Sequence, residues 1–252
     1  MSSAKMPQDK TINRILYRIA IATSTAFNAL IGRPKIYFES EKAQFKNLPK
    51  RLIIICNHTY WLDPANLSIL FRKSLVNSVA AKEVFEGGRG PLMRGLRCIP
   101  LDRSTMDLAC IKECVKRLKD DQRVVIFPEG QLNLTDEILE FKAGAALIAM
   151  QAQSDVVPVY TSGVYRPFGG LKIMVGNPIS YDELFPQSLG ATAMVNATNL
   201  MQKRMQALSI GLMEKLTDKE KETRLKSRQK FAEKRKRIEE NRNTDKGGKN
   251  DN

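Results

Sequence analysis

Histidine and tryptophan are nearly absent from this chain of 252 residues, which contains one of each, and only four cysteines are present. Cys56, Cys98, Cys110 and Cys114 form no CxxC pair and no spacing typical of a disulfide framework, so a reducing compartment is expected. Cys110 and Cys114 lie one helical turn apart, but two thiols and one histidine make a poor zinc site. No run of 18 apolar residues occurs, which excludes a polytopic membrane protein.

The signatures of three common enzyme classes are also missing. The chain contains no G-x-S-x-G nucleophile elbow, no GxxxxGK[ST] phosphate loop and no GxGxxG dinucleotide fingerprint. Hydrolase, P-loop and dinucleotide-binding functions therefore lack their main support. The length is enough for one large domain or two small ones with a sizeable core, and no internal repeat is found.

Acidic residues are outnumbered by basic ones. The chain has 41 lysines and arginines against 27 aspartates and glutamates, a net charge of +14. Residues 214–252 contribute +5 of this, and the remaining body contributes +9. A basic body indicates an anionic partner, which can be nucleic acid, a phospholipid surface or a phosphorylated or acidic substrate, although the charge can also serve solubility alone.

Apolar residues near the N-terminus recur at helical spacing, at positions 12, 15, 16, 19, 22, 26, 27 and 30. Only 14 uncharged residues separate Arg18 from Arg33, fewer than the roughly 20 needed to cross a bilayer. The pattern predicts a basic amphipathic helix within residues 1–34 that lies in the membrane interface. A helix that packs on the domain body is the alternative.

Short apolar runs alternate with helical patterns through the middle of the chain. Strands are predicted at 52–56, 76–81, 98–101, 123–127, 155–160 and 172–176, and helices at 63–71, 105–119 and 141–153. This order predicts an α/β fold, a single domain over residues 35–212 with a mostly parallel central sheet flanked by helices. The pattern is helical again from about 192 to 241, and residues 213–252 form a charged tail that is either a solvated helix or disordered.

The only histidine, His58, follows the predicted strand at 52–56. Sites in open α/β sheets form at the carboxyl ends of strands, and a histidine can take a proton from an alcohol at physiological pH. Asp63 can cap the next helix, or turn back and hold the imidazole as a carboxylate does in a catalytic triad. No serine lies beside this pair and Cys56 is expected to be buried, which favours direct attack by a substrate hydroxyl. A purely structural histidine is the alternative.

Two further strand ends carry charged side chains. Glu129 follows the strand at 123–127 in the sequence Phe-Pro-Glu-Gly, where it can hold a substrate hydroxyl or brace the site. Arg103 follows the strand at 98–101, and its guanidinium suits bidentate binding of phosphate. A loop carboxylate and an arginine paired with Asp102 or another acid are the alternative interpretations.

In this order and spacing, the segments resemble the glycerolipid acyltransferase family that includes 1-acylglycerol-3-phosphate acyltransferases. Its first motif, N-H-x-x-x-x-D, matches Asn57, His58 and Asp63, and its second motif ends in an arginine that matches Arg103. The third motif, F-P-E-G, matches residues 127–130 in full.

The resemblance continues beyond the third motif and covers roughly residues 50–180. An F-K-x-G segment matches 141–144, and an apolar strand with a central proline matches 156–159. One departure stands out, because the family's third motif commonly continues G-T-R-S and this chain has Gly-Gln-Leu-Asn at 130–133. Leu132 replaces the arginine, which removes a potential phosphate ligand and leaves Arg103 and Lys142 as the available cations.

The resemblance implies transfer of a fatty acyl group from acyl-CoA or acyl-acyl carrier protein to the free hydroxyl of 1-acylglycerol 3-phosphate, giving phosphatidic acid. His58 acts as the general base and Asp63 orients it, without a covalent intermediate, a metal or a redox cofactor. The implied substrate-binding residues are Asn57, Arg103, Glu129, Gly130 and Lys142. The implied location is an anionic membrane surface on the cytoplasmic face.

Three other functions remain open at this point. A glycerol-3-phosphate acyltransferase, or an enzyme for another lyso-lipid, would use the same chemistry. A basic scaffold without catalysis would bind membranes or nucleic acid, and residues 234–237 could grip the latter. Interleaved glutamates and the lack of a recognised nucleic-acid motif argue against a nucleic-acid partner.

Overall fold

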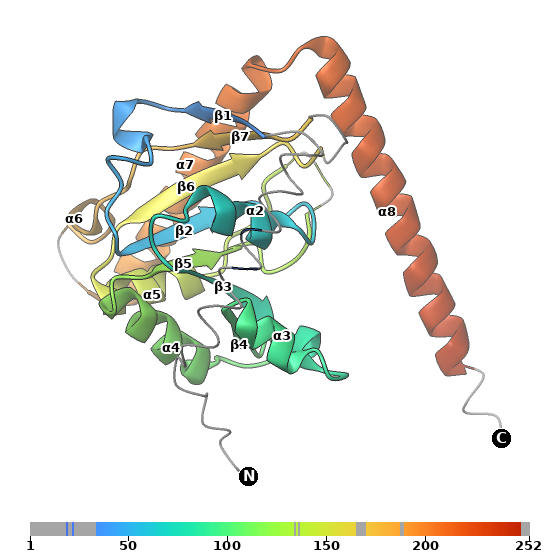
Figure 1. Cartoon of the computed structure of the whole chain (residues 1–252), viewed down its shortest axis with the longest axis horizontal. Coiled ribbons are helices and arrows are strands. Elements are labelled where there is room, and N and C mark those ends of the chain that lie inside the picture. The colour runs from blue at the N-terminus through green and yellow to red at the C-terminus, as the bar shows by residue number, and fades with distance from the viewer. Residues whose placement is uncertain are drawn as a thin grey trace, which may run out of the picture.

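The computed structural model describes residues 34–247 together with Ile19 and Ala22, except residues 134, 136, 165–169, 187 and 188 (Figure 1). The amphipathic helix predicted within residues 1–34 therefore lies almost entirely outside the described residues. Within the described part of the chain, no helix combines the length and the apolar character that a membrane span requires.

Seven strands of the described chain form one sheet in the order β1, β7, β6, β2, β5, β3, β4. Their bounds are β1 Lys35–Phe38, β2 Leu52–Cys56, β3 Val76–Ala81, β4 Cys98–Leu101, β5 Arg123–Ile126, β6 Val156–Thr161 and β7 Lys172–Val175. All neighbouring pairs are parallel except β6 and β7, which are antiparallel. The predicted α/β domain with a mostly parallel sheet is confirmed.

The sheet is central because its middle strands are apolar on both faces. All five residues of β2 are fully buried between β5 and β6. Side chains alternate along a strand, so Ile53 and Ile55 contribute to the core on one face while Leu52, Ile54 and Cys56 contribute to the core on the other. A strand buried in this way fixes the position of the residues that follow it.

The helices are α2 Asp63–Leu70, α3 Gly90–Gly95, α4 Leu108–Lys119, α5 Gly144–Ala152, α6 Tyr181–Leu184, α7 Ala191–Glu214 and α8 Asp218–Gly247, with 3₁₀ turns η1 Glu41–Ala43 and η2 Lys82–Phe85. One core cluster joins α4, α5 and α7 to a sheet face. A second cluster joins α2 and the segment around Ala43 and Leu48 to the opposite face. The molecule thus has three layers, with helices on both sides of the sheet (Figure 1).

The predicted elements differ from the structure mainly at their ends. The helix predicted from residue 105 begins at Leu108, because the Asp107 side chain accepts a hydrogen bond from the Cys110 backbone N–H at 2.9 Å and caps it. The helix predicted from residue 141 begins at Gly144. The sequence analysis missed β1, an edge strand of only four residues that shows no alternation of polar and apolar side chains.

The C-terminal tail begins as a docked helix. Figure 1 shows α8 as a long arm that leaves the body, yet the Arg224 side chain in its second turn is buried. Its Nε donates to the Ser162 carbonyl at 3.1 Å, and its Nη2 donates to the Tyr160 hydroxyl at 2.9 Å. Glu220 pairs with Lys172 of β7. The predicted helix is present, but its first turns are anchored by charged residues and are not simply solvated.

We expect Gly176→Ala to weaken the packing of α7 on the sheet. A Cβ at Gly176 would lie 2.7 Å from Leu208 Cδ1 and 2.8 Å from Pro158 Cγ, and the proline ring cannot move aside easily. The free energy of unfolding should fall by about 1–3 kcal/mol, as for other overpacked sites. Chemical denaturation followed by circular dichroism measures this change.

The matched control is Gly95→Ala in α3, where an added Cβ meets no atom within 4 Å. Because alanine favours helix, we expect this variant to be as stable as the wild type or slightly more stable. Equal stability of the two variants would contradict the close approach of α7 to Gly176.

Candidate active site

The charged residues singled out from the sequence gather at one edge of the sheet. His58, Arg103 and Glu129 follow the carboxyl ends of β2, β4 and β5, which all run in the same direction. β2 and β5 are direct neighbours, whereas β4 is the last strand of the sheet. Carboxyl ends of parallel strands are where sites form in open α/β sheets.

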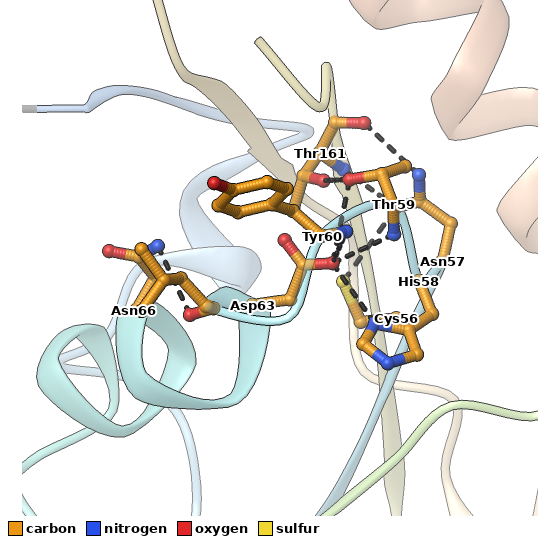
Figure 2. A network of polar contacts seen from close by, with 9 residues as sticks. Cys56, Asn57, His58, Thr59, Tyr60, Asp63, Asn66 and Thr161 are labelled. Carbon is orange, nitrogen blue, oxygen red and sulfur yellow. Dashed lines mark hydrogen bonds and ion pairs between the residues drawn. The ribbon is translucent and has the colours of Figure 1, made fainter. Parts of the chain in front are cut away.

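His58 and Asp63 form a buried hydrogen-bonded pair (Figure 2). His58 Nδ1 lies 3.1 Å from Asp63 Oδ2, and the aspartate side chain is fully buried while the histidine side chain is 20% exposed. Because a carboxylate only accepts hydrogen bonds, Nδ1 carries the proton and Nε2 keeps its lone pair. The ring is thereby set up to accept a proton at Nε2.

Asp63 does not cap the following helix, so that prediction is wrong. The N-cap residue of α2 is Leu62, and it makes no side-chain capping bond. The Asp63 carboxylate instead turns back and accepts the backbone N–H groups of Thr59 and Tyr60, both at 2.8 Å (Figure 2). These donors hold the charged form of the carboxylate, which in turn holds the histidine ring.

The His58 ring also contacts the third motif. It stacks on the Phe127 ring with centroids 4.1 Å apart and an angle of 24° between the planes. The His58 carbonyl accepts a hydrogen bond from the Asn133 backbone N–H at 2.6 Å. The ring and the backbone of His58 are therefore both fixed by the segment that follows β5.

Asn57 ties β2 to β6. Its Oδ1 accepts the Thr161 N–H at 2.8 Å and its Nδ2 donates to the Thr161 carbonyl at 3.1 Å, so both ends of the carboxamide are engaged. Thr59 adds a hydroxyl contact to Thr161 at 3.4 Å and lies where a Cβ at Gly163 would come within 2.9 Å. The substrate-binding role predicted for Asn57 stays a prediction, and its observed contacts brace the loop that carries His58.

Glu129 is buried beside this pair, with 3% of its surface exposed. Its Oε2 accepts hydrogen bonds from Asn133 Nδ2 at 2.5 Å and from the Leu139 backbone N–H at 3.2 Å. Among the described residues, its other oxygen, Oε1, is buried without a hydrogen-bond partner. Burial raises the pKa of Glu129, and the donors from Leu139 and Asn133, together with the nearby His58, oppose the rise.

Two cations meet at the turn after Glu129. Gly130 has φ of +67°, and a Cβ there would lie 2.8 Å from Lys142 Cε, so only glycine suits this position. The Lys142 side chain runs over the glycine, and Arg103 Nη1 approaches the Gly130 carbonyl at 3.4 Å. Glu83 lies 3.6 Å from the Arg103 guanidinium on the solvent side.

The arginine is not paired with Asp102, which binds Lys82 instead. Arg103 and Lys142 are both solvent-exposed, and they come from segments 39 positions apart in the chain. The arrangement places two positive charges beside Gly130, which is the chemistry of an anion site.

Cys56 is excluded as a nucleophile. The thiol is fully buried at the end of β2, and burial together with the nearby Asp63 and Glu129 carboxylates raises its pKa well above the ordinary value. A protonated, inaccessible thiol cannot attack a carbonyl. In the part of the chain that the structure describes, no three His, Cys, Asp or Glu side chains are grouped so that they could hold a metal ion.

Sequence reasoning missed three residues that shape this site. Phe127 was noted only as a motif letter, Thr161 falls at the end of a predicted strand, and Asn133 stood in the segment that departs from the family pattern. Phe127 directly follows β5, the neighbour of β2, so its contact with His58 could have been inferred from the pairing of these strands. Nothing in the sequence pairs Asn57 with Thr161.

Comparison with known proteins identifies the domain. Residues 39–162 match the family model described as Acyltransferase, and this span contains His58, Asp63, Arg103, Glu129 and Lys142. The chain therefore carries an Acyltransferase domain over these residues. It is an O-acyltransferase, as the resemblance of its motifs implied.

Named relatives cover this acyltransferase to different extents. The 1-acyl-sn-glycerol-3-phosphate acyltransferase of Bacillus subtilis is 26% identical over 202 residues, which is 76% of this chain and 97% of that one. The human 1-acyl-sn-glycerol-3-phosphate acyltransferase beta is 31% identical over 45% of this chain and 44% of its own length. The coconut enzyme of the same name is 33% identical over 54% of this chain and 44% of its length.

The same fold occurs in a solved structure. The crystal structure titled 1-acyl-sn-glycerophosphate acyltransferase, PlsC, from Thermotoga maritima aligns with a TM-score of 0.53 and 18% sequence identity. The alignment covers 78% of this acyltransferase and 79% of that chain. The agreement supports the α/β architecture described above.

We expect Glu129→Gln to stabilise the acyltransferase at neutral pH. The wild type buries a carboxylate whose charged form burial disfavours, and an amide of the same shape carries no charge, so the free energy of unfolding should rise. A carboxyl whose pKa is raised by folding lowers stability as pH rises through that pKa. The gain should therefore shrink at acidic pH, which thermal unfolding over a pH series measures.

Glu137→Gln is the control for charge alone, because Glu137 lies in the same loop and is exposed. We expect no change in its unfolding temperature at any pH in the series. A Glu129→Gln variant that is less stable than wild type at neutral pH would contradict the burial of an ionised, half-satisfied carboxylate.

Proposed function

We propose that this enzyme transfers a fatty acyl group from a thioester to the free hydroxyl of 1-acylglycerol 3-phosphate, giving phosphatidic acid. The observation that carries the proposal is the His58–Asp63 pair, which leaves Nε2 free to accept a proton at the same sheet edge as the two cations at Gly130. The names of the relatives support the acceptor. The donor is acyl-CoA or acyl-acyl carrier protein.

In the proposed reaction, His58 acts as the general base. Its Nε2 removes the proton from the acceptor hydroxyl as the oxygen attacks the thioester carbonyl, and Asp63 stabilises the imidazolium that forms. The tetrahedral intermediate then collapses, the C–S bond breaks, and the thiolate takes the proton back from the imidazolium. No acyl-enzyme forms, and the buried, protonated thiol of Cys56 is consistent with this.

Glu129 and the two cations would bind the acceptor. Glu129 adjoins Gly130 and is joined to the His58 backbone through Asn133, so its carboxylate is suited to accept a hydrogen bond from a glycerol hydroxyl. Arg103 and Lys142 would hold the phosphate, with Gly130 leaving room for Lys142. In this proposal, Arg103 and Lys142 bind the phosphate in place of the arginine that the family motif has at the position of Leu132.

The reaction is tested by measuring thioester consumption with purified protein and both kinds of donor. Lysophosphatidic acid, glycerol 3-phosphate and a neutral lyso-lipid are offered in parallel. We expect lysophosphatidic acid to be the best acceptor and His58→Ala to lower the rate by about 10²–10⁴-fold, the usual contribution of a general base.

Cys56→Ala is the matched control at the same strand end, and we expect it to retain activity. Circular dichroism establishes that each variant is folded. Wild-type rates in folded His58→Ala would refute the mechanism. Preference for glycerol 3-phosphate or for a neutral lyso-lipid would keep the chemistry and replace the acceptor.

We also propose that the active-site edge faces an anionic membrane surface on the cytoplasmic side, where lysophospholipid and product reside. Trp61, three positions after His58, is 66% exposed, and the exposed apolar side chains of Val84, Leu92 and Met106 lie in segments that follow β3 and β4. Tryptophan favours the membrane interface. The basic body, and the helix predicted within 1–34, would add electrostatic attraction and apolar contact.

Residues 35–212 would form the catalytic unit and 213–252 the charged tail.

Trp61 is the only tryptophan, so its fluorescence reports on this edge alone. We expect vesicles that contain phosphatidylglycerol to shift the emission to shorter wavelength, and added salt to reduce the shift. Neutral phosphatidylcholine vesicles are the control and should produce a smaller shift. Protein that sediments with the anionic vesicles while its emission stays unshifted would contradict docking by this edge.

A further inference from the structure

The Asn133 side chain occupies the centre of the loop after the third motif. The residue is 5% exposed. Its Nδ2 donates to Glu129 Oε2 at 2.5 Å and to the Glu137 carbonyl at 2.6 Å, and its Oδ1 accepts the N–H and the hydroxyl of Thr135, each at 2.8 Å. All of its usual hydrogen-bonding groups are thus engaged within the site.

Asn133 connects Glu129 to the backbone of His58 in the candidate active site. Its side chain holds the Glu129 carboxylate, while its backbone N–H donates to the His58 carbonyl at 2.6 Å. With Leu139 as the second donor, Oε2 of Glu129 is fully engaged and the orientation of the carboxylate is fixed.

A serine, which the glycerolipid acyltransferases commonly have at this position of the third motif, could not replace all of these bonds. A hydroxyl donates one hydrogen, whereas the carboxamide donates two and accepts as well. Asn133 therefore combines a bond to Glu129 with two bonds that close the loop on Thr135 and Glu137. The loop closure and the carboxylate position depend on the same side chain.

We propose that Asn133 is a positioning residue that acts through Glu129, holding the carboxylate beside His58 at the place where the acceptor binds. The inference rests on the proposed function of Glu129 as an acceptor-binding group. It differs from a purely structural role, in which Asn133 would only keep the loop folded. A structural role predicts loss of active protein, and a positioning role predicts weaker use of the acceptor.

The steady-state test uses Asn133→Asp and the control Thr135→Val. Asn133→Asp keeps the acceptor for Thr135 but replaces the donor to Glu129 with a second carboxylate. We expect kcat/KM for lysophosphatidic acid to fall about 10–100-fold, with a raised acceptor KM and an unchanged donor KM. Thr135→Val removes the hydroxyl bonds to Asn133 Oδ1 and to the Glu137 carbonyl but keeps the backbone N–H bond to Oδ1, and it should stay within about twofold of wild type.

Loss of folded enzyme lowers kcat while leaving both KM values unchanged, and that result would overturn the inference. If Asn133→Asp does not fold, Asn133→Ala, which removes the donor without adding a charge, is measured in the same way. An unchanged acceptor KM in a folded Asn133→Ala variant would also overturn it.

A second readout does not depend on activity. The donated hydrogen bond favours the ionised form of Glu129, so its removal in Asn133→Ala should raise the pKa of that carboxyl. Carbon-13 NMR of labelled glutamate carboxyls follows the titration. An unshifted Glu129 titration would overturn the positioning role of Asn133, whichever lipid is the acceptor. Wild-type protein that transfers no acyl group would overturn the proposed function alone.

Discussion

The buried carboxylate of Asp63 is the constraint on which the active-site edge depends. An ionised group with no exposed surface is tolerated only where hydrogen bonds replace water, and Thr59, Tyr60 and His58 supply them. To make these hydrogen bonds, the chain between β2 and α2 folds around Oδ2 of Asp63. Because β2 is buried on both faces, the loop has a fixed origin, and the imidazole can take only one orientation.

Each motif of the family is held by another motif. Asn57 binds the end of β6, His58 stacks on Phe127, and Asn133 joins the His58 backbone to Glu129. These ties cross from strand to neighbouring strand, so the order of the sheet decides which motifs can meet. The spacing of the motifs along the chain is therefore secondary to their places at one sheet edge.

The sequence predicted features that depend on local pattern and missed those that depend on distant contacts. The apolar run of β2 and the five-residue step from His58 to Asp63 were sufficient to place a strand and a paired base. Asp63 was also read as a helix cap, because a sequence does not state which backbone N–H groups a carboxylate will find. The buried Arg224 was missed for a similar reason, since a charged side chain looks solvated until its partners on β6 are known.

The docking of α8 has a consequence for where the folded unit ends. Arg224 donates hydrogen bonds to the Ser162 carbonyl and the Tyr160 hydroxyl at the end of β6. These residues flank Thr161, which is hydrogen-bonded to Asn57. Leu216, in the turn before α8, is buried as well. A shortened chain that stops after α7 would expose polar groups at the strand end that supports His58. The loss of apolar residues near 212 therefore does not mark the end of the folded unit. Beyond that position, an arginine side chain holds the chain to the body in place of an apolar stripe.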